Sequence, residues 1–295
     1  MNQTMTPKQL ETHLKNNISS LKFEDLPSYK EAKASYAKVR HELGFKLAPG
    51  QFLSTEEDIT KLDMGSGRYT LGLSLPPATS SDIANLCAFE DQCAEKCVGT
   101  GGSNRFTTAS NGKLARLKLL VEDTPAAIAM IVYGIESKVK VHTQEGVGVR
   151  LNVYSDLRWE RVLPTWFWKR FANVVFYDYT KHPLSSRPVS SLPDNYKLTY
   201  SVSQRSTVQQ ISIQRKAGRS VAVVVETRGG KIPNTKDYRP FSVEVDGVSV
   251  IDGDANDRRY LDEPGSVVLL RRKNGLPKSN PLVRDDQQLL AIVNN

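Results

Sequence analysis

The first part of the chain carries apolar residues at the spacing of α-helices. Residues 6–9 (TPKQ) and 28–31 (SYKE) have the form of capping boxes, and the first places proline at the first helical position. The second capping box is followed by an apolar helical face formed by Ala32, Tyr36, Val39 and Leu43. We therefore predict helices within residues 6–48, with the Ala48-Pro49-Gly50 sequence ending the last of them.

From residue 68 onward, short apolar runs alternate with helical periods. The predicted strands are residues 68–75, 147–153, 174–179, 197–202 and 221–225. The predicted helices are residues 113–133 (interrupted at Pro125), 164–171 and 207–217. Residues 241–270 predict short strands and turns. This alternation is typical of an α/β fold with a mostly parallel sheet, and we expect a partial (β/α) barrel with an N-terminal helical appendage.

The composition is that of a globular protein, with 39% hydrophobic and 24% charged residues. The N-terminal residues are polar, and no run has the roughly 18–20 apolar residues of a membrane helix, so we expect no membrane association and a cytoplasmic location. The net charge is +8, densest at Arg271-Arg272-Lys273. That charge is typical either of a solvated basic surface or of a nucleic-acid partner.

All three cysteines fall within one short segment, spaced Cys87-x5-Cys93-x3-Cys97. An odd number of clustered cysteines argues against a secreted disulfide framework. Three interpretations of these cysteines are open. They are ordinary thiols, or they bind zinc with a fourth ligand such as His142, His182 or an acidic residue, or they hold an iron–sulfur cluster with one iron that no cysteine binds. We favour the cluster. The nearby Gly99, Gly101 and Gly102 would let backbone amides approach it or an anionic ligand.

Other polar residues gather at the ends of the predicted strands. The candidates for binding or catalysis are Arg150, Asn152, Asp156, Asp178 and Lys181. Parallel strands carry functional loops at their carboxyl ends, so these side chains are expected near the cysteine loop. The structural alternatives are an ion pair of Arg150 with Asp156 or Glu160, and capping of a turn by Thr180.

Three further features have mainly structural interpretations. Residues 252–257 contain three aspartates but lack the pattern of an EF-hand, so we expect a turn. We expect Arg258 and Asp262 to pair beside it, and His182 to be an exposed histidine. The three tryptophans are expected to pack in the core and on helices.

Five ordered segments resemble the phage and plasmid-borne family called gene product eighty-eight. They are residues 86–97, 149–160, 176–181, 196–201 and 250–262, within a likeness over residues 65–275. The resemblance implies a phage or mobile-element origin, hence the host cytoplasm, and a cysteine motif of the iron–sulfur type. The layout also looks like radical S-adenosylmethionine enzymes, although those typically space their cysteines as C-x3-C-x2-C.

The resemblance divides the chain into three parts. These are an N-terminal helical region over residues 1–62, an α/β domain over residues 63–275 with the cysteine loop at 86–102, and a C-terminal tail over 276–295. Two functions are compatible with these features. The first is an enzyme with a [4Fe-4S] cluster whose open iron binds a substrate or S-adenosylmethionine. The second is a non-catalytic, nucleic-acid-associated protein in which a cluster or zinc stabilises the loop.

Overall fold

The structure is a computed structural model that describes residues 4–45, 51–58, 67–90, 93, 97, 99–100, 106–225, 248–272, 276–277 and 279–293. Its α-helices are α1 (Pro7–Ile18), α2 (Tyr29–Glu42), α3 (Thr107–Glu122), α4 (Thr124–Val141), α5 (Trp159–Val162), α6 (Thr165–Arg170), α7 (Val208–Lys216) and α8 (Asp286–Val293). Its strands are β1 (Ser54–Thr55), β2 (Tyr69–Gly72), β3 (Val147–Arg150), β4 (Val175–Thr180), β5 (Tyr196–Ser201), β6 (Val221–Val225), β7 (Val250–Asp252), β8 (Val267–Arg271) and β9 (Val283–Arg284). Short 3-10 helices lie at Phe23–Asp25, Glu56–Asp58, Val189–Ser191 and Arg259–Leu261.

The local signals in the sequence account for most of these helices. Both predicted capping boxes form, at Thr6 with Gln9 and at Ser28 with Glu31. The break expected at Pro125 is the boundary between α3 and α4, and this proline lies in the first turn of α4. α2 ends at Glu42, and the predicted stop at residues 48–50 lies outside the described residues.

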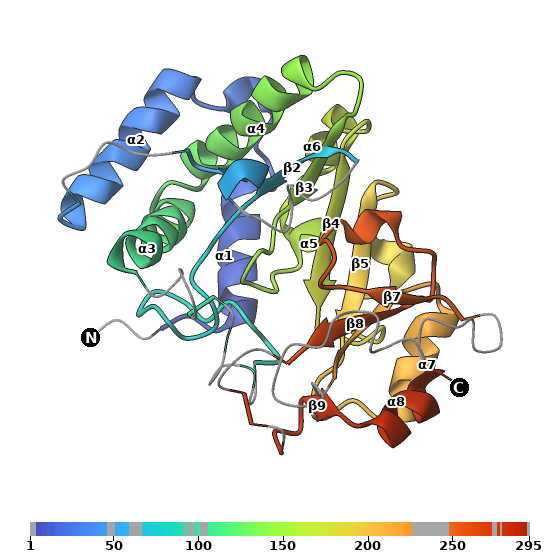
Figure 1. The fold of residues 1–295 in the computed structure, drawn as a ribbon. Helices are drawn as coiled ribbons and strands as arrows, with labels where there is room; N and C mark the ends of the chain where they lie inside the picture. Colours follow the sequence, from blue (N-terminus) through green and yellow to red (C-terminus); the bar gives the residue numbers. More distant parts are fainter. Residues whose placement is uncertain are drawn as a thin grey trace.

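The nine described strands form one sheet in the order β1-β2-β3-β4-β5-β6-β8-β7, with β9 also paired to β6. β1 is antiparallel to β2, and the remaining pairs are parallel. Because β2 to β6 are neighbours in chain order and parallel crossovers are right-handed, their connections cover one face of the sheet. The sheet does not close, which confirms the expected α/β fold with a partial barrel and N-terminal helices (Figure 1).

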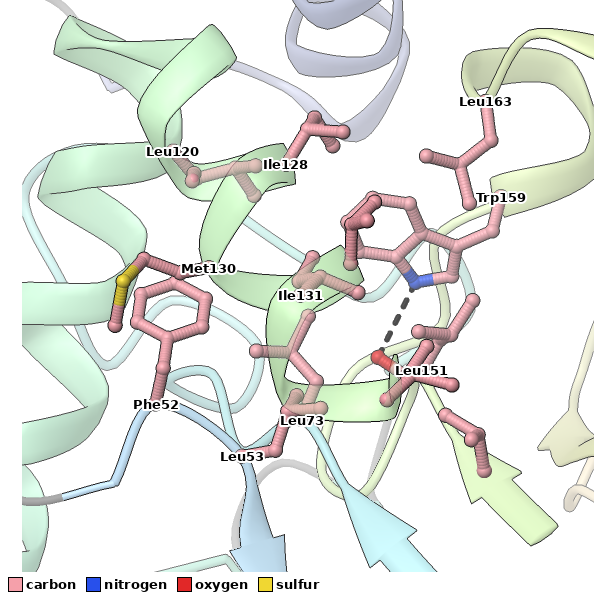
Figure 2. Close-up of a cluster of buried hydrophobic side chains, with 14 of the residues drawn as sticks. Phe52, Leu53, Leu73, Leu120, Ile128, Met130, Ile131, Leu151, Trp159 and Leu163 are labelled. Atoms are coloured by element: carbon pink, nitrogen blue, oxygen red, sulfur yellow. Dashed lines mark hydrogen bonds between the residues drawn. The ribbon is translucent and has the colours of Figure 1, made fainter. Parts of the chain in front are cut away.

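A large apolar core joins the N-terminal helices to the sheet. α2, α3 and α4 lie together on one side of the molecule (Figure 1). Trp159 is fully buried between α4 and the end of β3, and its indole Nε1 donates a hydrogen bond to the Leu151 carbonyl over 3.2 Å (Figure 2). Trp168 is also buried, as expected for packing tryptophans. The N-terminal helices therefore share one core with the first strands.

The C-terminal residues add a second, smaller core. Residues 276–293, within the predicted tail, contribute β9 and α8, and Leu289, Ile292 and Val293 are buried. These side chains pack with those of β6 and β8. α8 lies beside α7 (Figure 1). Residues 241–247 of the last predicted stretch lie outside the described residues, and residues 248–271 form β7, a short 3-10 helix and β8.

Candidate functional site

A pocket of about 140 Å³ lies at the carboxyl ends of the parallel strands β3, β4 and β5. One wall comes from the strand ends, with residues 154–156 after β3, 179–181 at the end of β4, and Ser201 at the end of β5. The other wall comes from Ala78, Cys87, Phe89, Glu90, Cys93 and Cys97. The volume is several times the roughly 30 Å³ of a water molecule, so the pocket has room for a multi-atom group.

All three cysteines reach this pocket as free, partly buried thiols. The Cys87 Sγ lies 3.8 Å from the Tyr154 carbonyl, and the Gly99 amide donates to the Cys97 Sγ over 3.4 Å. Burial raises the pKa of the Cys87 thiol, and the nearby Asp156 carboxylate raises it further. Burial also raises the pKa of Cys97. With no metal bound, both side chains are therefore protonated, neutral thiols at neutral pH.

Two backbone positions near the cysteines are unusual: one has a positive φ angle, and the other is tightly packed. Ala78 has a φ of 43°, which is uncommon for a residue with a Cβ, and its backbone acts to lower the pKa of the Cys87 thiol, against the larger effect of burial. A Cβ on Gly99 would lie 3.0 Å from the Pro77 side chain and 3.1 Å from Tyr154. Gly99 thus allows close packing and places its amide on Cys97, whereas Gly101 and Gly102 lie outside the described residues.

Two lysines stand close to the thiols. Lys113 of α3 is buried, donates through Nζ to the Gly99 carbonyl over 2.6 Å, and lies over the Tyr154 ring at 4.7 Å. Lys181 lines the pocket and donates through Nζ to the Ser201 hydroxyl over 2.9 Å. Against the larger effect of burial, both ammonium groups favour the thiolate form of Cys97 and lower its pKa.

A buried polar network holds the strand-end wall. The Asp156 carboxylate accepts from the Lys181 backbone amide over 2.8 Å and from Arg187 Nη1 over 3.3 Å. Arg187 is fully buried, and it also donates to Glu160 over 2.7 Å and to the Tyr196 hydroxyl over 3.0 Å. Asp156 and Lys181, both candidates from the sequence, therefore belong to one site.

Asp178 and Asn152 belong to the same network and are buried. The Asp178 carboxylate accepts from the Asn152 amide over 2.8 Å and from the Tyr196 hydroxyl over 2.7 Å. Burial raises the pKa of Asp178 to about 6. Neither side chain lines the pocket, so we assign both a supporting role.

Arg150 has partners other than those expected. It pairs with Asp257, whose carboxylate also accepts from the Tyr179 hydroxyl over 3.0 Å. Asp156 and Glu160, the partners considered from the sequence, bind Arg187 instead. Of Arg150, Asp257 and Tyr179, only Tyr179 lines the pocket. Arg150 is therefore connected to the pocket through its partners and does not face it directly.

The structure corrects two other expectations and confirms two. His182 is buried rather than exposed, with the Phe89 ring packed edge-on against it at 5.0 Å. Asp262 pairs with Arg259, whereas Arg258 pairs with Glu56. Thr180 accepts from the His182 amide as a turn cap, and Asp252 accepts from the Asp254 amide within a turn.

The N-terminal segment supports the cysteine loop from outside the strands. Met5 forms a parallel bridge with Ala84, and the Asn85 amide donates to the Met5 carbonyl over 2.8 Å. The Asn85 side chain in turn accepts from the Cys87 amide over 2.8 Å. Glu11 of α1 accepts from the Arg158 guanidinium and backbone amide. The Met5 contacts hold the segment before Cys87, and the Glu11 contacts hold the segment that follows Asp156.

Several residues of the site carry no clear signal in the sequence. Lys113 is one lysine within a predicted helix, Arg187 lies outside the five family-like segments, and Ser201 is a neutral residue at the end of one of them. The only hint for Lys113 is a charged residue among the apolar positions of that helix. The partners of Arg187 lie 27 and 31 positions earlier in the chain, so local spacing does not reveal them.

Within the described part of the chain, no three His, Cys, Asp or Glu side chains are grouped tightly enough to hold a single metal ion. In the same residues, no helix has the length and apolar character needed to cross a membrane. His142 and His182, the histidines considered as a fourth zinc ligand, do not line the pocket. The acidic residues that line it are Glu90 and Asp156.

Comparison with known proteins places the chain in a family. No curated protein and no solved structure matches it significantly. A family model described as gene product 88 matches residues 46–290, which is most of the chain and extends beyond the likeness over residues 65–275. The chain therefore belongs to the gene product 88 family.

Proposed function

We propose that this chain is a phage or mobile-element iron–sulfur enzyme of the host cytoplasm, with a [4Fe-4S] cluster held by Cys87, Cys93 and Cys97. The single observation that carries the proposal is that all three thiols line one pocket at the carboxyl ends of parallel strands. This is the edge at which α/β sheets bind ligands and carry catalytic groups.

The donor set fits a cluster. Thiolates are the usual ligands of iron–sulfur clusters, and each binds a different iron, so the sulfurs need to line one cavity rather than converge on one point. Lys113 and Lys181 would offset the negative charge that three thiolates bring into a partly buried pocket. The Gly99 amide, which donates to the Cys97 Sγ, would stabilise the same charge.

The residues of this chain would prepare the pocket for a reaction at its strand-end wall. When bound, such a cluster supplies one iron without a protein thiolate, which can bind a substrate or cofactor and exchange an electron with it. Asp156 fixes the Lys181 backbone, so that the lysine side chain faces the pocket. Ala78, Phe89 and Tyr154 also line the cavity and give it apolar surface beside the thiols. S-adenosylmethionine is one cofactor that such a site could bind.

The proposal predicts that full-length protein purified without oxygen contains iron and sulfide in equal amounts and absorbs broadly in the visible range. Cys93→Ser should lose most of the iron and the colour, because two thiolates hold a cluster poorly. Ser80→Ala, an exposed change in the segment before the cysteine loop, is the matched control and should retain both. Iron, sulfide and zinc analysis with visible absorption measures all three proteins.

A colourless, iron-free wild type with stoichiometric zinc would contradict the proposal. That outcome would favour the second role, a non-catalytic protein in which zinc stabilises the loop. The net charge of +8 would then point to nucleic acid as the partner.

Metal binding at this site should also depend on pH in a defined direction. Burial raises the pKa of Cys87 and Cys97, and a metal ion must displace the thiol protons to bind. The affinity for a probe such as Co²⁺ should therefore rise with pH and continue to rise beyond about 8.5, the pKa of an ordinary cysteine. The increase should approach tenfold per pH unit for each proton displaced.

Titration of the metal-free protein with Co²⁺, followed by the thiolate-to-cobalt absorption band, measures this dependence. Cys93→Ser should show a shallower rise because one fewer proton is displaced. An affinity that stops rising well below the ordinary cysteine pKa would contradict the burial of the thiols.

A further inference from the structure

The cysteine pocket presents two opposite charges that lack ionic partners among the described residues. Lys181 donates to the neutral Ser201 hydroxyl and forms no ion pair with a described acid. Glu90 uses its Oε1 to accept from the Asn85 side chain over 2.9 Å, while its Oε2 is buried with no hydrogen-bond partner. A buried carboxylate oxygen without a donor is costly, and a ligand group could supply one.

The two charges come from different walls of the same cavity. Lys181 and Ser201 stand at the ends of β4 and β5, whereas Glu90 belongs to the cysteine loop. Asp156 is the other carboxylate in the pocket, but each of its oxygens already accepts a hydrogen bond, one from the Lys181 backbone N–H and one from Arg187. Glu90 is thus the carboxylate with an acceptor to spare.

A compact ligand that satisfies both walls must carry an anion and a cation. Lys181 has three N–H donors, of which Ser201 takes one, so two can bind a carboxylate. The Glu90 Oε2 can accept from an ammonium group. Because Lys181 and Glu90 line the same cavity, a zwitterion that enters it meets both residues.

We propose that the pocket binds the α-amino-acid group of its ligand, with the carboxylate on Lys181 and Ser201 and the ammonium on Glu90. The inference rests on the proposed function, because the cluster is what would make this pocket reactive toward the ligand. It adds a ligand class, amino acids or their derivatives, and a role for Glu90 that no sequence motif indicates.

Binding can be measured by calorimetry on the anaerobically purified full-length protein with three small probes. L-methionine carries both charges, methylthiopropylamine lacks the carboxylate, and methylthiopropionate lacks the ammonium. A charged hydrogen bond contributes about 1.5–3 kcal/mol, so the wild type should bind methionine at least about tenfold more tightly than either analogue. S-adenosylmethionine and methylthioadenosine form a second pair, which tests whether the amino-acid group comes free or attached to adenosine.

Two variants should remove one preference each. Lys181→Met should bind methionine and methylthiopropylamine equally, because the carboxylate has lost its partner. Glu90→Gln should bind methionine and methylthiopropionate with nearly equal affinity. Lys216→Met, an exposed change on α7, should behave like the wild type. Iron and sulfide contents, measured on the same samples, should be unchanged in Glu90→Gln and Lys216→Met. Lys181→Met should retain most of its iron, because Lys113 still stands beside the thiols.

The outcomes separate this inference from the proposed function. Protein that contains iron and sulfide but binds the three small probes equally, or binds none of the five, would overturn the α-amino-acid site alone. Loss of iron in Lys181→Met with unchanged probe preference would also overturn it and make Lys181 a residue that holds the cluster. Iron-free wild type would overturn the proposed function itself.

Discussion

Replacing Arg187 by methionine is expected to lower the free energy of unfolding by about 3–5 kcal/mol, because the change leaves buried carboxylates without their cation. Arg187 is fully buried and binds Asp156, Glu160 and the Tyr196 hydroxyl. Methionine fills similar space but neutralises nothing. Urea unfolding followed by circular dichroism measures the effect.

The Arg187→Met variant should also make the strand-end wall of the pocket less rigid. Asp156 accepts from the Lys181 amide on one side and from Arg187 on the other, so losing Arg187 frees this wall. Arg161→Met is the matched control, since Arg161 is exposed and, among the described residues, its side chain donates only to the Ser186 carbonyl. Equal stability of the two variants would show that the buried network contributes little.

Glu11→Ala is expected to cost about 3 kcal/mol, at the lower end for a broken buried ion pair, because the Arg158 side chain keeps some access to water. Glu11 accepts from Arg158 through the backbone amide, Nε and Nη2. Glu11 precedes the region that matches the gene product 88 family, whereas Arg158 lies within it. Its loss should therefore loosen α1 from the part of the fold that matches the family.

A double-mutant cycle makes the second prediction specific. Arg158→Met alone should also destabilise, but the double variant should cost clearly less than the sum of the two single changes, because both partners of the pair are then gone. Glu24→Ala, an exposed change in the first 3-10 helix, is the control for surface charge. Purely additive costs would argue that Glu11 and Arg158 do not act as a pair.

The elements of the fold could be predicted largely because their signals are local. Capping boxes at Thr6 and Ser28, the proline at position 125 and the apolar run of β6 each act within a few residues. The lengths of strands were less predictable: β2 covers only Tyr69–Gly72 and is buried on both faces, although its sequence alternates. Both faces of β2 are buried because other layers of the structure cover them. The alternation of residues within one strand does not indicate which layers will cover it.

The candidate site was predictable in its position and less so in its contacts. The spacing of the cysteines and the polar strand ends led to residues that do line one pocket, among them Asp156 and Lys181. The partner of Arg150 was not predictable, since Asp257 lies 107 positions away. The sequence predicts an exposed His182, yet it is buried, with Phe89 from the cysteine loop packed against it.

By itself, the sequence determined most of the helices and strands between residues 6 and 225, that the sheet is mostly parallel, and that three thiols fall in one loop after β2. It did not reveal β9 and α8, which lie in the predicted C-terminal tail. These properties follow from neighbouring residues and from chain order. Only the tertiary structure decided which charges meet: Arg187 with Asp156 and Glu160, Glu11 with Arg158, and Lys113 with the Gly99 carbonyl. Such contacts depend on strand register and on how layers pack, and a buried charge binds whichever partner that packing brings within hydrogen-bond distance.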